Sequence, residues 1–416
     1  MLYRLKDAGY EAYLVGGGVR DLLLGREPKD FDVATDAHPE QIKAVFRNCR
    51  LIGRRFRLAH VHFGREIIEV ATFRAQHNGD EEGGVTEDGG RIVRDNVYGT
   101  VEDDAVRRDF TVNALYYNIK DFSVVDYAGG IDDLEAGMLK LIGDPEVRYR
   151  EDAVRMLRAV RFAAKLGFRI HPEAEAPIFE LGHLLSDIAA ARLFEEVLKL
   201  FLGGSAVQTY ELLGHYDLLQ YLFPQTAHEL ENDQGGRFHA LILRAMENTD
   251  SRIAEGKPVT PAFLYAVFMW LPMQRRAKQL RREGMTETQS ICEAGAEVLA
   301  EQSRCVVFPR RYSLQTREIW QLQPRLKRIT GKGTLRLLGH PRFRAAYDFL
   351  LLRAESGEQS LQELCEWWTE YQLANPDVVK QSASRAAPKK RARRRPRKKQ
   401  AADNRPATGS GEQESH

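Results

Sequence analysis

The sequence predicts an α+β domain at the N-terminus, a long all-helical region after it and a disordered basic tail. Short strand-like and helix-like segments alternate over about the first 125 residues. From about Ile131 onward, apolar residues recur at three- and four-residue spacing almost without interruption, which indicates helices. With 416 residues, 43% of them hydrophobic, the chain is long enough to bury the cores of two or three domains.

The elements of the N-terminal domain follow from local patterns. Five runs that are apolar, or that alternate apolar with polar residues, predict strands, and two amphipathic stretches predict helices. The strands are residues 13–15, 31–34, 58–63, 67–72 and 114–119, and the helices are residues 19–24 and 39–46. Residues 76–94 are rich in Gly, Asp and Glu with almost no apolar periodicity, so they predict a surface loop. Turn residues at 126–130 predict the end of this domain.

The helical region divides at two breaks in its pattern. Two glycines at 203–204 and a Gly-Lys-Pro sequence at 256–258 interrupt the apolar spacing. The chain is therefore expected to comprise a head at residues 1–130, a neck at 131–202, a body at 203–375 and a disordered tail at 376–416.

Two short motifs in the head predict its chemistry. The glycine triplet at residues 16–18 follows the first strand and precedes a helix, where it allows a turn that brings backbone N–H groups close to phosphate oxygens. Asp30 and Asp32 are separated by Phe31, and the strand period of two places both carboxylates on one face. Neighbouring carboxylates repel each other, and a divalent cation between them, usually Mg²⁺ bridged to a triphosphate, relieves that repulsion.

Each of these features also has a simpler explanation. A glycine triplet alone is usually a turn, and this one is neither a P-loop nor the dinucleotide-binding fingerprint, because Asp21 occupies the place of the fingerprint's last glycine. Arg20 and Asp21 could form an ordinary ion pair on a helix surface. Asp-x-Asp alone is more often the exposed end of a strand. The order and spacing of the motifs together are typical of polymerase-type nucleotidyltransferases.

Three longer segments resemble the successive motifs of the bacterial poly(A) polymerase and CCA-adding enzyme family. They are LVGGGVRDLLLGREPKDFDVAT at residues 14–35, RRDFTVNALYY at 107–117 and EDAVRMLRAVRFAAKLGF at 151–168. The similarity runs from about residue 2 to about residue 201, and residues 50–64 and parts of 300–370 resemble the poly(A) polymerase branch. Members of that branch carry a leader before the first motif, so we expect either a start upstream of Met1 or a less supported first helix.

The resemblance implies a fold and a reaction. The head is expected to have the polymerase-beta-like fold, with a small mixed sheet and helices, followed by helical neck and body domains that grip RNA. The reaction is attack of an RNA 3′-hydroxyl on the α-phosphate of ATP, which adds AMP and releases pyrophosphate. Tails of this kind would mark RNA for decay.

The resemblance also implies roles for individual residues. Asp30, Asp32 and Asp109 correspond to the catalytic carboxylates, and Asp30 and Asp32 would hold two Mg²⁺ ions. Glu69, a charged residue in an apolar strand, is the other candidate for the third metal carboxylate, but Asp109 is favoured because it matches the family's second motif. The alternatives are a surface position for Glu69 and a salt bridge between Asp109 and a preceding arginine. Contacts to the nucleotide are expected from Gly17, Gly18, Arg20, Asp21, Arg108, Asp152, Arg155 and Arg158.

Asp152 and Arg155 carry the prediction about base choice. They stand three residues apart in a helical pattern whose buried stripe includes Val154 and Leu157, so they are expected to share an outer face. An acid in the first turn of a helix, paired with a base one turn later, would explain them without a ligand. In the family, the carboxylate accepts from an exocyclic amine and the guanidinium donates to a ring acceptor, which selects adenine and cytosine over guanine and uracil. Residues 192–196 resemble the motif that stiffens this pocket, although their spacing also fits a plain helix ion pair.

Basic charge is concentrated in the tail. Residues 380–416 hold 12 Lys and Arg against 3 Asp and Glu, a charge of +9 in a chain whose net charge is +2. Such a segment cannot bury a core and predicts a polyanionic partner, RNA first and an anionic membrane surface second. A solubilising tail with no partner is the alternative.

The composition also indicates a compartment and a set of partners. Four cysteines without CxxC spacing argue against zinc and for a reducing cytoplasm, and no signal peptide opens the chain. We expect a cytoplasmic monomer, with peripheral association at the inner face of the membrane as an extension. Its expected partners are RNA 3′ ends, bound by body and tail, together with ATP and the RNA-decay machinery.

The favoured hypothesis is a template-independent poly(A) polymerase, and three others are weighed against it. A CCA-adding enzyme shares every catalytic motif, so the choice depends on residues 51–61, where such enzymes usually lack the Arg-Arg-Phe sequence. A non-catalytic RNA-binding protein is disfavoured by the intact Asp30, Asp32 and Asp109. A small-molecule nucleotidyltransferase is disfavoured by the long helical body and the polycationic tail.

Overall fold

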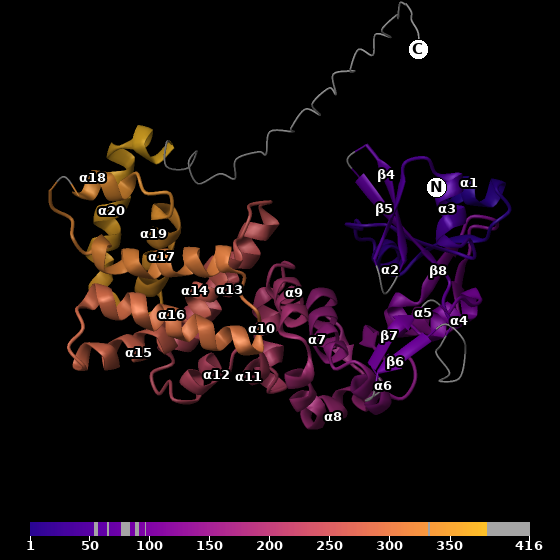
Figure 1. The fold of residues 1–416 in the computed structure, drawn as a ribbon, viewed down its shortest axis with the longest axis horizontal. Coiled ribbons are helices and arrows are strands. Elements are labelled where there is room, and N and C mark those ends of the chain that lie inside the picture. Colours follow the sequence, from indigo (N-terminus) through magenta and orange to yellow (C-terminus); the bar gives the residue numbers. More distant parts are fainter. Residues whose placement is uncertain are drawn as a thin grey trace, which may run out of the picture.

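The computed structural model describes residues 1–53, 57–64, 66–75, 84–87, 91–95, 97–331 and 333–380. The described chain forms an arc in which the head lies at one end, the body at the other and the neck helices between them (Figure 1). Residues 54–56, which contributed to the resemblance to the poly(A) polymerase branch, and residues 381–416 of the predicted tail lie outside the described residues.

The head is built on a seven-stranded mixed sheet with the strand order β3-β4-β5-β2-β1-β8-β9. All neighbouring strands are antiparallel except β2 and β5, which run parallel. The strand β2, which begins at Asp32, therefore lies in the middle of the sheet between β1 and β5. The strands are β1 (Ala12–Val15), β2 (Asp32–Thr35), β3 (Cys49–Ile52), β4 (Leu58–Phe63), β5 (Glu66–Thr72), β8 (Leu115–Asn118) and β9 (Val124–Asp126).

Short helices complete the head. The helices are α1 (Leu2–Asp7), α2 (Gly17–Leu23), α3 (Pro39–Val45) and α4 (Val101–Val106), followed by a 3₁₀ turn at Thr111–Asn113. Leu5, Ile42 and Phe46 are buried against apolar residues of the central strands, which anchors α1 and α3 to the sheet. The helix predicted next to Met1 is thus packed by Leu5, which is fully buried.

The five predicted strands are all present, each to within one residue at either end. Two further strands, β3 and β9, were not predicted, because they have only four and three residues and no clear alternation. The surface loop predicted at residues 76–94 was wrong in part, since β6 (Gly84–Glu87) and β7 (Arg91–Asp95) pair there as an antiparallel hairpin. The β-branched residues in those two short runs favour strands, but the surrounding Gly, Asp and Glu masked the signal.

The neck is helical with one small interruption. Its elements are α5 (Gly130–Glu135), β10 (Met138–Leu139), α6 (Pro145–Glu151), α7 (Val154–Leu166), β11 (Arg169–Ile170), α8 (Pro172–Leu181), a 3₁₀ turn at Gly182–Asp187 and α9 (Ala190–Phe201). The parallel pair β10–β11 is a short exception to the predicted, almost uninterrupted helical pattern. The buried stripe predicted on α7 is confirmed, since Val154, Leu157 and Val160 are fully buried.

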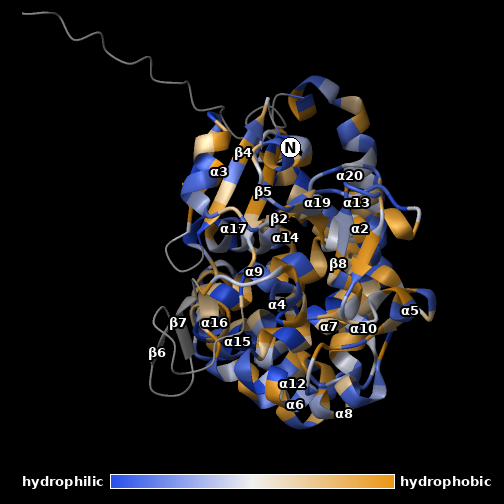
Figure 2. Ribbon diagram, turned by 90° about the vertical axis from the view of Figure 1, so that its right-hand side faces the viewer, coloured by the Kyte–Doolittle hydropathy of each residue, from blue (hydrophilic) through white to orange (hydrophobic). Residues whose placement is uncertain are grey.

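The body is a bundle of helices that shares a continuous apolar core with the neck. Apolar and polar positions mix along the same helices, as expected where amphipathic helices pack against one another (Figure 2). Both predicted breaks fall between helices, and none of the described helices is long and apolar enough to cross a membrane. The helices are α10 (Ala206–His215), α11 (Leu219–Leu222), α12 (Pro224–Glu231), α13 (Arg237–Ala254), α14 (Pro261–Phe268), α15 (Trp270–Arg282), α16 (Glu287–Cys305), α17 (Arg310–Leu326), α18 (Gly333–Leu338), α19 (Phe343–Glu355) and α20 (Gln362–Ala374).

Candidate active site at the junction of head and neck

A cavity of about 340 Å³ opens where α2 and the start of β2 face α7 and the end of α9. It brings together parts of the chain that are almost two hundred residues apart, and it contains both acidic and basic side chains. Its lining residues are Gly17, Gly18, Arg20, Asp21, Lys29, Asp30, Asp32, Arg161, Lys165, Lys199, Leu202, Gly203 and Ser205. Six of the residues predicted from the two head motifs therefore lie around one cavity.

Asp30 and Asp32 line the acidic side of this cavity, and Glu69, which does not line it, lies on the strand next to Asp32. Asp32 is the first residue of β2 and is exposed, while Asp30 precedes the strand, as it also precedes the strand predicted at residues 31–34. Glu69 is the register partner of Asp32 on the parallel strand β5. Although Asp32 reaches the surface, the surrounding protein desolvates its carboxylate and raises its pKa, and the charges of Glu69 and Asp30 raise it further, against the opposing effect of Arg108. This crowding of like charge is what a bound divalent cation would relieve.

Glu69 has a second neighbour that the sequence analysis missed. His60 on β4 is the cross-strand partner of Glu69, and its Nε2 lies 3.0 Å from Glu69 Oε1. The Glu69 side chain remains half exposed. The hydrogen bond from His60 orients the Glu69 carboxylate next to Asp32. Glu69 is therefore more than an exposed residue on a half-exposed strand, which was the alternative considered for it. Alternation within β4 marks His60 as facing away from the buried Ala59 and Val61, but only the register shows that it meets Glu69.

Asp109 has a different environment from the one predicted. Its carboxylate pairs with Arg158 on α7, where Arg158 Nε donates to Oδ2 at 2.7 Å, and it also accepts from Asn113 Nδ2 at 3.3 Å and from the Phe110 N–H at 2.9 Å. Burial would raise the pKa of Asp109, but these three donors, Arg158 first, bring it below its usual value. Neither Asp109 nor Glu69 is among the residues that line the cavity. The strand register sets Glu69 opposite Asp32, whereas Asp109 is paired with Arg158, so the register favours Glu69 as the carboxylate beside Asp32.

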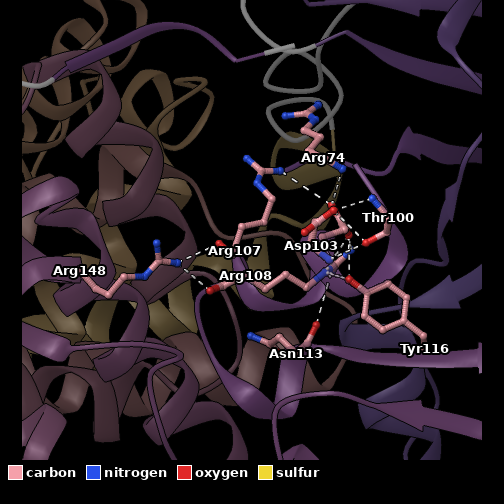
Figure 3. A network of polar contacts seen from close by, with 9 residues as sticks. Arg74, Thr100, Asp103, Arg107, Arg108, Asn113, Tyr116 and Arg148 are labelled. Atoms are coloured by element: carbon pink, nitrogen blue, oxygen red, sulfur yellow. Dashed lines mark hydrogen bonds and ion pairs between the residues drawn. The ribbon is translucent and has the colours of Figure 1, made fainter. Parts of the chain in front are cut away.

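The alternative proposed for Asp109, a salt bridge to a preceding arginine, also differs from the structure. Arg108 instead pairs with Asp104, whose Oδ2 lies 2.9 Å from Arg108 Nη2, and Arg108 Nε donates to the Tyr116 hydroxyl at 2.7 Å (Figure 3). Burial lowers the pKa of Arg108, but Asp104 and Tyr116 outweigh that effect and raise it. Arg108 is thus held as a cation close enough to Asp32 to lower its pKa.

Arg20 and Asp21 form a buried pair rather than a surface pair. The Arg20 side chain is 2% exposed, and its Nε donates to Asp21 Oδ1 at 2.9 Å while its Nη1 donates to Asn113 Oδ1 at 2.5 Å. Lys165 Nζ from α7 lies 3.4 Å from Asp21 Oδ2. Asp21 therefore connects α2 of the head to α7 of the neck beside the cavity.

Glycine is required at two positions of the triplet. Gly16 has φ of +72°, and a Cβ there would lie 3.3 Å from Arg108 Nη1. A Cβ on Gly18 would lie 3.3 Å from the carbonyl oxygen of Asp30. The triplet thus lets α2 begin directly against the segment that carries Asp30.

The residues expected to select the base are held in a way that the helical spacing did not predict. Asp152 lies between α6 and α7 with φ of −155°, so it does not share a helix face with Arg155. Asp152 Oδ2 accepts from Arg192 Nη2 at 2.6 Å, whereas Arg155 Nη1 donates to Glu151 Oε2 at 2.9 Å and to the carbonyl oxygen of Arg148 at 2.6 Å. Each member of the predicted pair is therefore oriented by another residue. The contact from Arg192 agrees with the stiffening role expected for residues 192–196.

A row of cations on one side of α7 runs from Arg155 past Arg158 to Arg161 and Lys165. Arg161 and Lys165 line the cavity together with the carboxylates of Asp21, Asp30 and Asp32. Burial lowers the pKa of both side chains, and the neighbouring Arg158 lowers that of Arg161 further. Arg161 Nε is buried without a hydrogen-bond partner. The site therefore holds cationic groups that an anionic ligand would stabilise.

Five cationic residues line the cavity, and only Arg20 among them was expected from the sequence to contact the nucleotide. Arg161 follows Arg158 by three residues on a helix, and that spacing could have identified it. Lys29 precedes Asp30 directly, whereas Lys199 reaches the cavity from α9 only through the tertiary fold. Lys165 follows Arg161 by four residues on the same helix, so the same spacing applies to it.

Asp30, Asp32 and Glu69 offer the chemistry that a hard divalent cation prefers, which is carboxylate oxygen. Within the part of the chain that the structure describes, no group of three or more His, Cys, Asp or Glu side chains is already arranged to hold a metal ion. A cation bound by one or two carboxylates with substrate phosphates as further ligands fits such a site. The residues present therefore fit Mg²⁺ held jointly by protein and nucleotide.

Comparison with family models matches the chain in three places. A poly A polymerase head domain matches residues 12–140, a probable RNA and SrmB-binding site of polymerase A matches residues 167–230, and a polymerase A arginine-rich C-terminus matches residues 283–401. Poly(A) polymerase I of Escherichia coli O6:H1 is 51% identical over 408 residues, which cover 96% of this chain and 88% of that protein. The chain belongs to the poly(A) polymerase family. Poly(A) polymerase I of Haemophilus influenzae is 49% identical over 91% of this chain and 84% of that protein.

CCA-adding enzymes are related at a greater distance. The CCA-adding enzyme of Lactobacillus helveticus is 38% identical over only 51% of this chain and 51% of that enzyme. Among solved structures, the Bacillus stearothermophilus CCA-adding enzyme in complex with CTP has a TM-score of 0.61 at 25% identity and covers 91% of this chain and 82% of that one. The nucleotidyltransferase head, the helical neck and most of the body thus share one architecture across both branches.

Proposed function

We propose that this protein is a template-independent poly(A) polymerase that adds AMP from ATP to RNA 3′ ends and releases pyrophosphate. The similarity to poly(A) polymerases over 96% of the chain carries this proposal, because the similarity to CCA-adding enzymes covers only about half. The similarity to poly(A) polymerases thus includes nearly half of the chain that the similarity to CCA-adding enzymes does not cover. The proposal extends to tails that promote RNA decay.

The residues proposed to hold Mg²⁺ are Asp30, Asp32 and Glu69, which lie where the central strand β2 begins. Bound Mg²⁺ supplies charge neutralisation at the phosphates and a lowered pKa of the attacking hydroxyl. Phosphoryl transfer depends on positioning and electrostatics more than on covalent help. The side chains of this chain therefore need to fix the triphosphate and the hydroxyl in line with each other.

The cations across the cavity are proposed to hold the triphosphate. Lys29, Arg161, Lys165 and Lys199 line the same cavity as Asp30 and Asp32, and Gly17 and Gly18 leave room for phosphate beside α2. Arg20 and Asp21 brace this wall. Arg108 and Arg158 approach from the layer behind the cavity, where Asp104 and Asp109 orient them.

Asp152 and Arg155 remain the proposed selectors of the base. A carboxylate acceptor and a guanidinium donor that both reach the base favour adenine or cytosine, because guanine and uracil present a carbonyl to the carboxylate. Arg192 orients Asp152 and Glu151 orients Arg155, so the two groups are fixed before the nucleotide arrives. Fixed groups discriminate better than mobile ones, because a wrong base then leaves a polar group unpaired.

The remaining parts of the proposal concern partners and location. The body and the basic tail bind RNA, and the RNA-decay machinery is a further partner. The protein acts in the cytoplasm as a monomer, with an anionic membrane surface as a second partner for the tail. The division into head, neck, body and tail at residues 130, 202 and 375 belongs to this proposal.

The test is incubation of the purified protein with an RNA primer, Mg²⁺ and each nucleoside triphosphate separately. The expected result is a long homopolymer with ATP, poor use of CTP and almost no use of GTP or UTP. Asp32→Asn should abolish extension, whereas the control Asp36→Asn, an exposed aspartate that follows the same strand, should not. Addition of two CMP residues and one AMP to a truncated tRNA, followed by arrest, would instead support the CCA-adding alternative.

A further inference from the structure

Arg148 joins the neck to the head next to the proposed site, although no motif in the sequence drew attention to it. It lies on α6, its side chain is almost entirely buried, and its guanidinium crosses to the end of α4 (Figure 3). The aliphatic part of the side chain packs close to Gly143, where an added Cβ would lie 3.7 Å from Arg148 Cδ. This side chain therefore spans the boundary between two structural units.

On the head side, Arg148 holds the backbone that carries two site residues. Its Nη2 donates to the carbonyl oxygens of Arg107 at 2.8 Å and Arg108 at 2.7 Å. Carbonyls at the end of a helix lack intrahelical partners and carry partial negative charge, so a guanidinium is a well-matched partner for them. These two hydrogen bonds fix the backbone of Arg108 and Asp109. The Arg108 side chain lies close enough to Asp32 to lower its pKa, and the Asp109 side chain pairs with Arg158.

On the neck side, Arg148 is part of the support of Arg155. Arg148 Nη1 donates to Glu151 Oε2 at 2.9 Å, and the same carboxylate oxygen accepts from Arg155 Nη1 at 2.9 Å. Arg155 Nη1 also donates to the main-chain oxygen of Arg148 at 2.6 Å. Glu151 is thus shared between two guanidinium groups, and its position depends on both.

We infer that Arg148 is a positioning residue that links the base-selecting end of the site to its phosphate and metal end. This inference rests on the proposed function. In it, Arg148 keeps Arg155 at a fixed position relative to Arg108 and Asp109. A base held correctly by Arg155 then lies at a fixed distance from the carboxylates. Loss of this link allows the two ends to move independently, and small errors in position are costly in reactions that depend on alignment.

The experiment compares Arg148→Met, Arg148→Lys and Arg150→Met with the wild type in single-nucleotide addition to an RNA primer. Arg150 is the matched control, because it lies on the same helix but is exposed and pairs only with Glu146 across the helix surface in the contacts described. Arg148→Met should lower kcat/KM for ATP by roughly 10- to 100-fold and lower the preference for ATP over GTP by about tenfold. Arg148→Lys keeps the charge and part of the hydrogen bonding, so it should recover part of both. Arg150→Met should change neither.

The preference ratio separates positioning from stability. A variant that is merely unfolded in part loses the same fraction of its rate with every nucleotide, so its ATP-to-GTP ratio stays at the wild-type value. Equal losses with all four nucleotides, or wild-type behaviour of Arg148→Met, would overturn the inference. A double variant with Arg155→Met should discriminate no worse than Arg155→Met alone, because the two residues act through one link.

Failure of the proposed function gives a different result. If the wild type itself adds no AMP, the proposed reaction is wrong, and equilibrium binding of ATP and GTP to the same four proteins tests the inference instead. Arg148→Met should then lose the binding preference that Arg150→Met retains. An unchanged preference in the binding assay would again overturn the role of Arg148.

Discussion

Asp109 and Glu69 should respond to substitution in opposite ways, because one lies in an ion pair and the other faces the carboxylates. We expect Asp109→Ala to destabilise the junction of head and neck, and we expect Glu69→Gln to leave stability nearly unchanged but to remove most activity. The Asp109 side chain is 13% exposed, and its partner Arg158 is 31% exposed. Removal of one partner from a buried pair costs about 3–5 kcal/mol, and the partial exposure of Arg158 places this case near the lower end, at about 3 kcal/mol.

The expected cost for Glu69→Gln is much smaller. The Glu69 side chain is 50% exposed, and the substitution only changes the strength of its hydrogen bond to His60. The change in the free energy of unfolding should therefore stay within about 0.5 kcal/mol. Loss of a carboxylate beside a catalytic metal removes several kcal/mol of transition-state stabilisation, which corresponds to a rate loss of at least about 100-fold. Glu66→Gln on the same strand is the matched control and should change neither quantity.

The assay for stability must report on the head and neck. All four tryptophans, Trp270, Trp320, Trp367 and Trp368, belong to the body, so tryptophan fluorescence would miss unfolding at the junction. Hydrogen exchange of amides in β1 and α7 measures the relevant opening free energy directly. Activity is measured as single AMP addition at a temperature where exchange shows the variants to be folded.

The pH dependence of the Asp109 effect provides a second check. The pKa of Asp109 is lowered in the folded state, so its contribution to stability is present above the unfolded-state value of about 3.9 and is lost as the pH falls through the folded-state value. The difference between wild type and Asp109→Ala should therefore shrink below about pH 4. The reasoning is refuted if Asp109→Ala retains the exchange protection of the wild type but loses activity, or if Glu69→Gln extends RNA at the wild-type rate.

Three further predictions concern the metal, the triphosphate and the tail. The pKa of Asp32 is raised in the folded state, so the charge of Asp32 lowers stability at neutral pH. Asp32→Asn should therefore raise the melting temperature measured without Mg²⁺, and this gain should vanish at acidic pH, where Asp32 of the wild type is protonated. A lowered melting temperature would contradict this prediction. Arg161→Met and Lys165→Met should each raise KM for ATP about tenfold, because both residues line the cavity. Lys278→Met, on the exposed side of α15, is the control and should leave KM unchanged. Equal KM values for all three variants in ATP titrations would refute the assignment of the cavity to the triphosphate. Removal of the residues after Lys380 should reduce the salt dependence of RNA affinity, and identical slopes for the two proteins in binding titrations would show that the tail is not involved.

Residues near in sequence were predicted well because their geometry is local. The period of a strand and the spacing of a helix are fixed by the backbone, so Asp30 and Asp32 could be placed together and the buried stripe of α7 could be identified. Asp152 is the instructive exception. It has helical residues on both sides, but the chain turns at this residue, between α6 and α7. The helix propensities of the neighbouring residues did not indicate this break.

Contacts between distant segments could not be derived from spacing. Arg158 reaches Asp109 across 49 residues, and Lys199 reaches the cavity from a helix at the far end of the neck. The parallel pairing of β2 with β5 sets Glu69 opposite Asp32, yet the sequence between those strands contains two more strands and gives no register. Such contacts depend on how the layers pack, which local patterns do not determine.

The comparison of Asp109 with Glu69 shows how a motif and a structure carry different information. Asp109 was favoured because it stands in a recognisable motif, and a motif records that a residue matters without stating what it does. In the structure, the charge of Asp109 is already matched by Arg158, whereas the charges of Asp32 and Glu69 lie together with Arg108 as the cation nearest to offset them. A divalent cation gains most where negative charge is unmatched. The carboxylates that bind it should therefore be the crowded ones, and the well-paired Asp109 is better suited to hold Arg158 in the row that leads from the base to the phosphates.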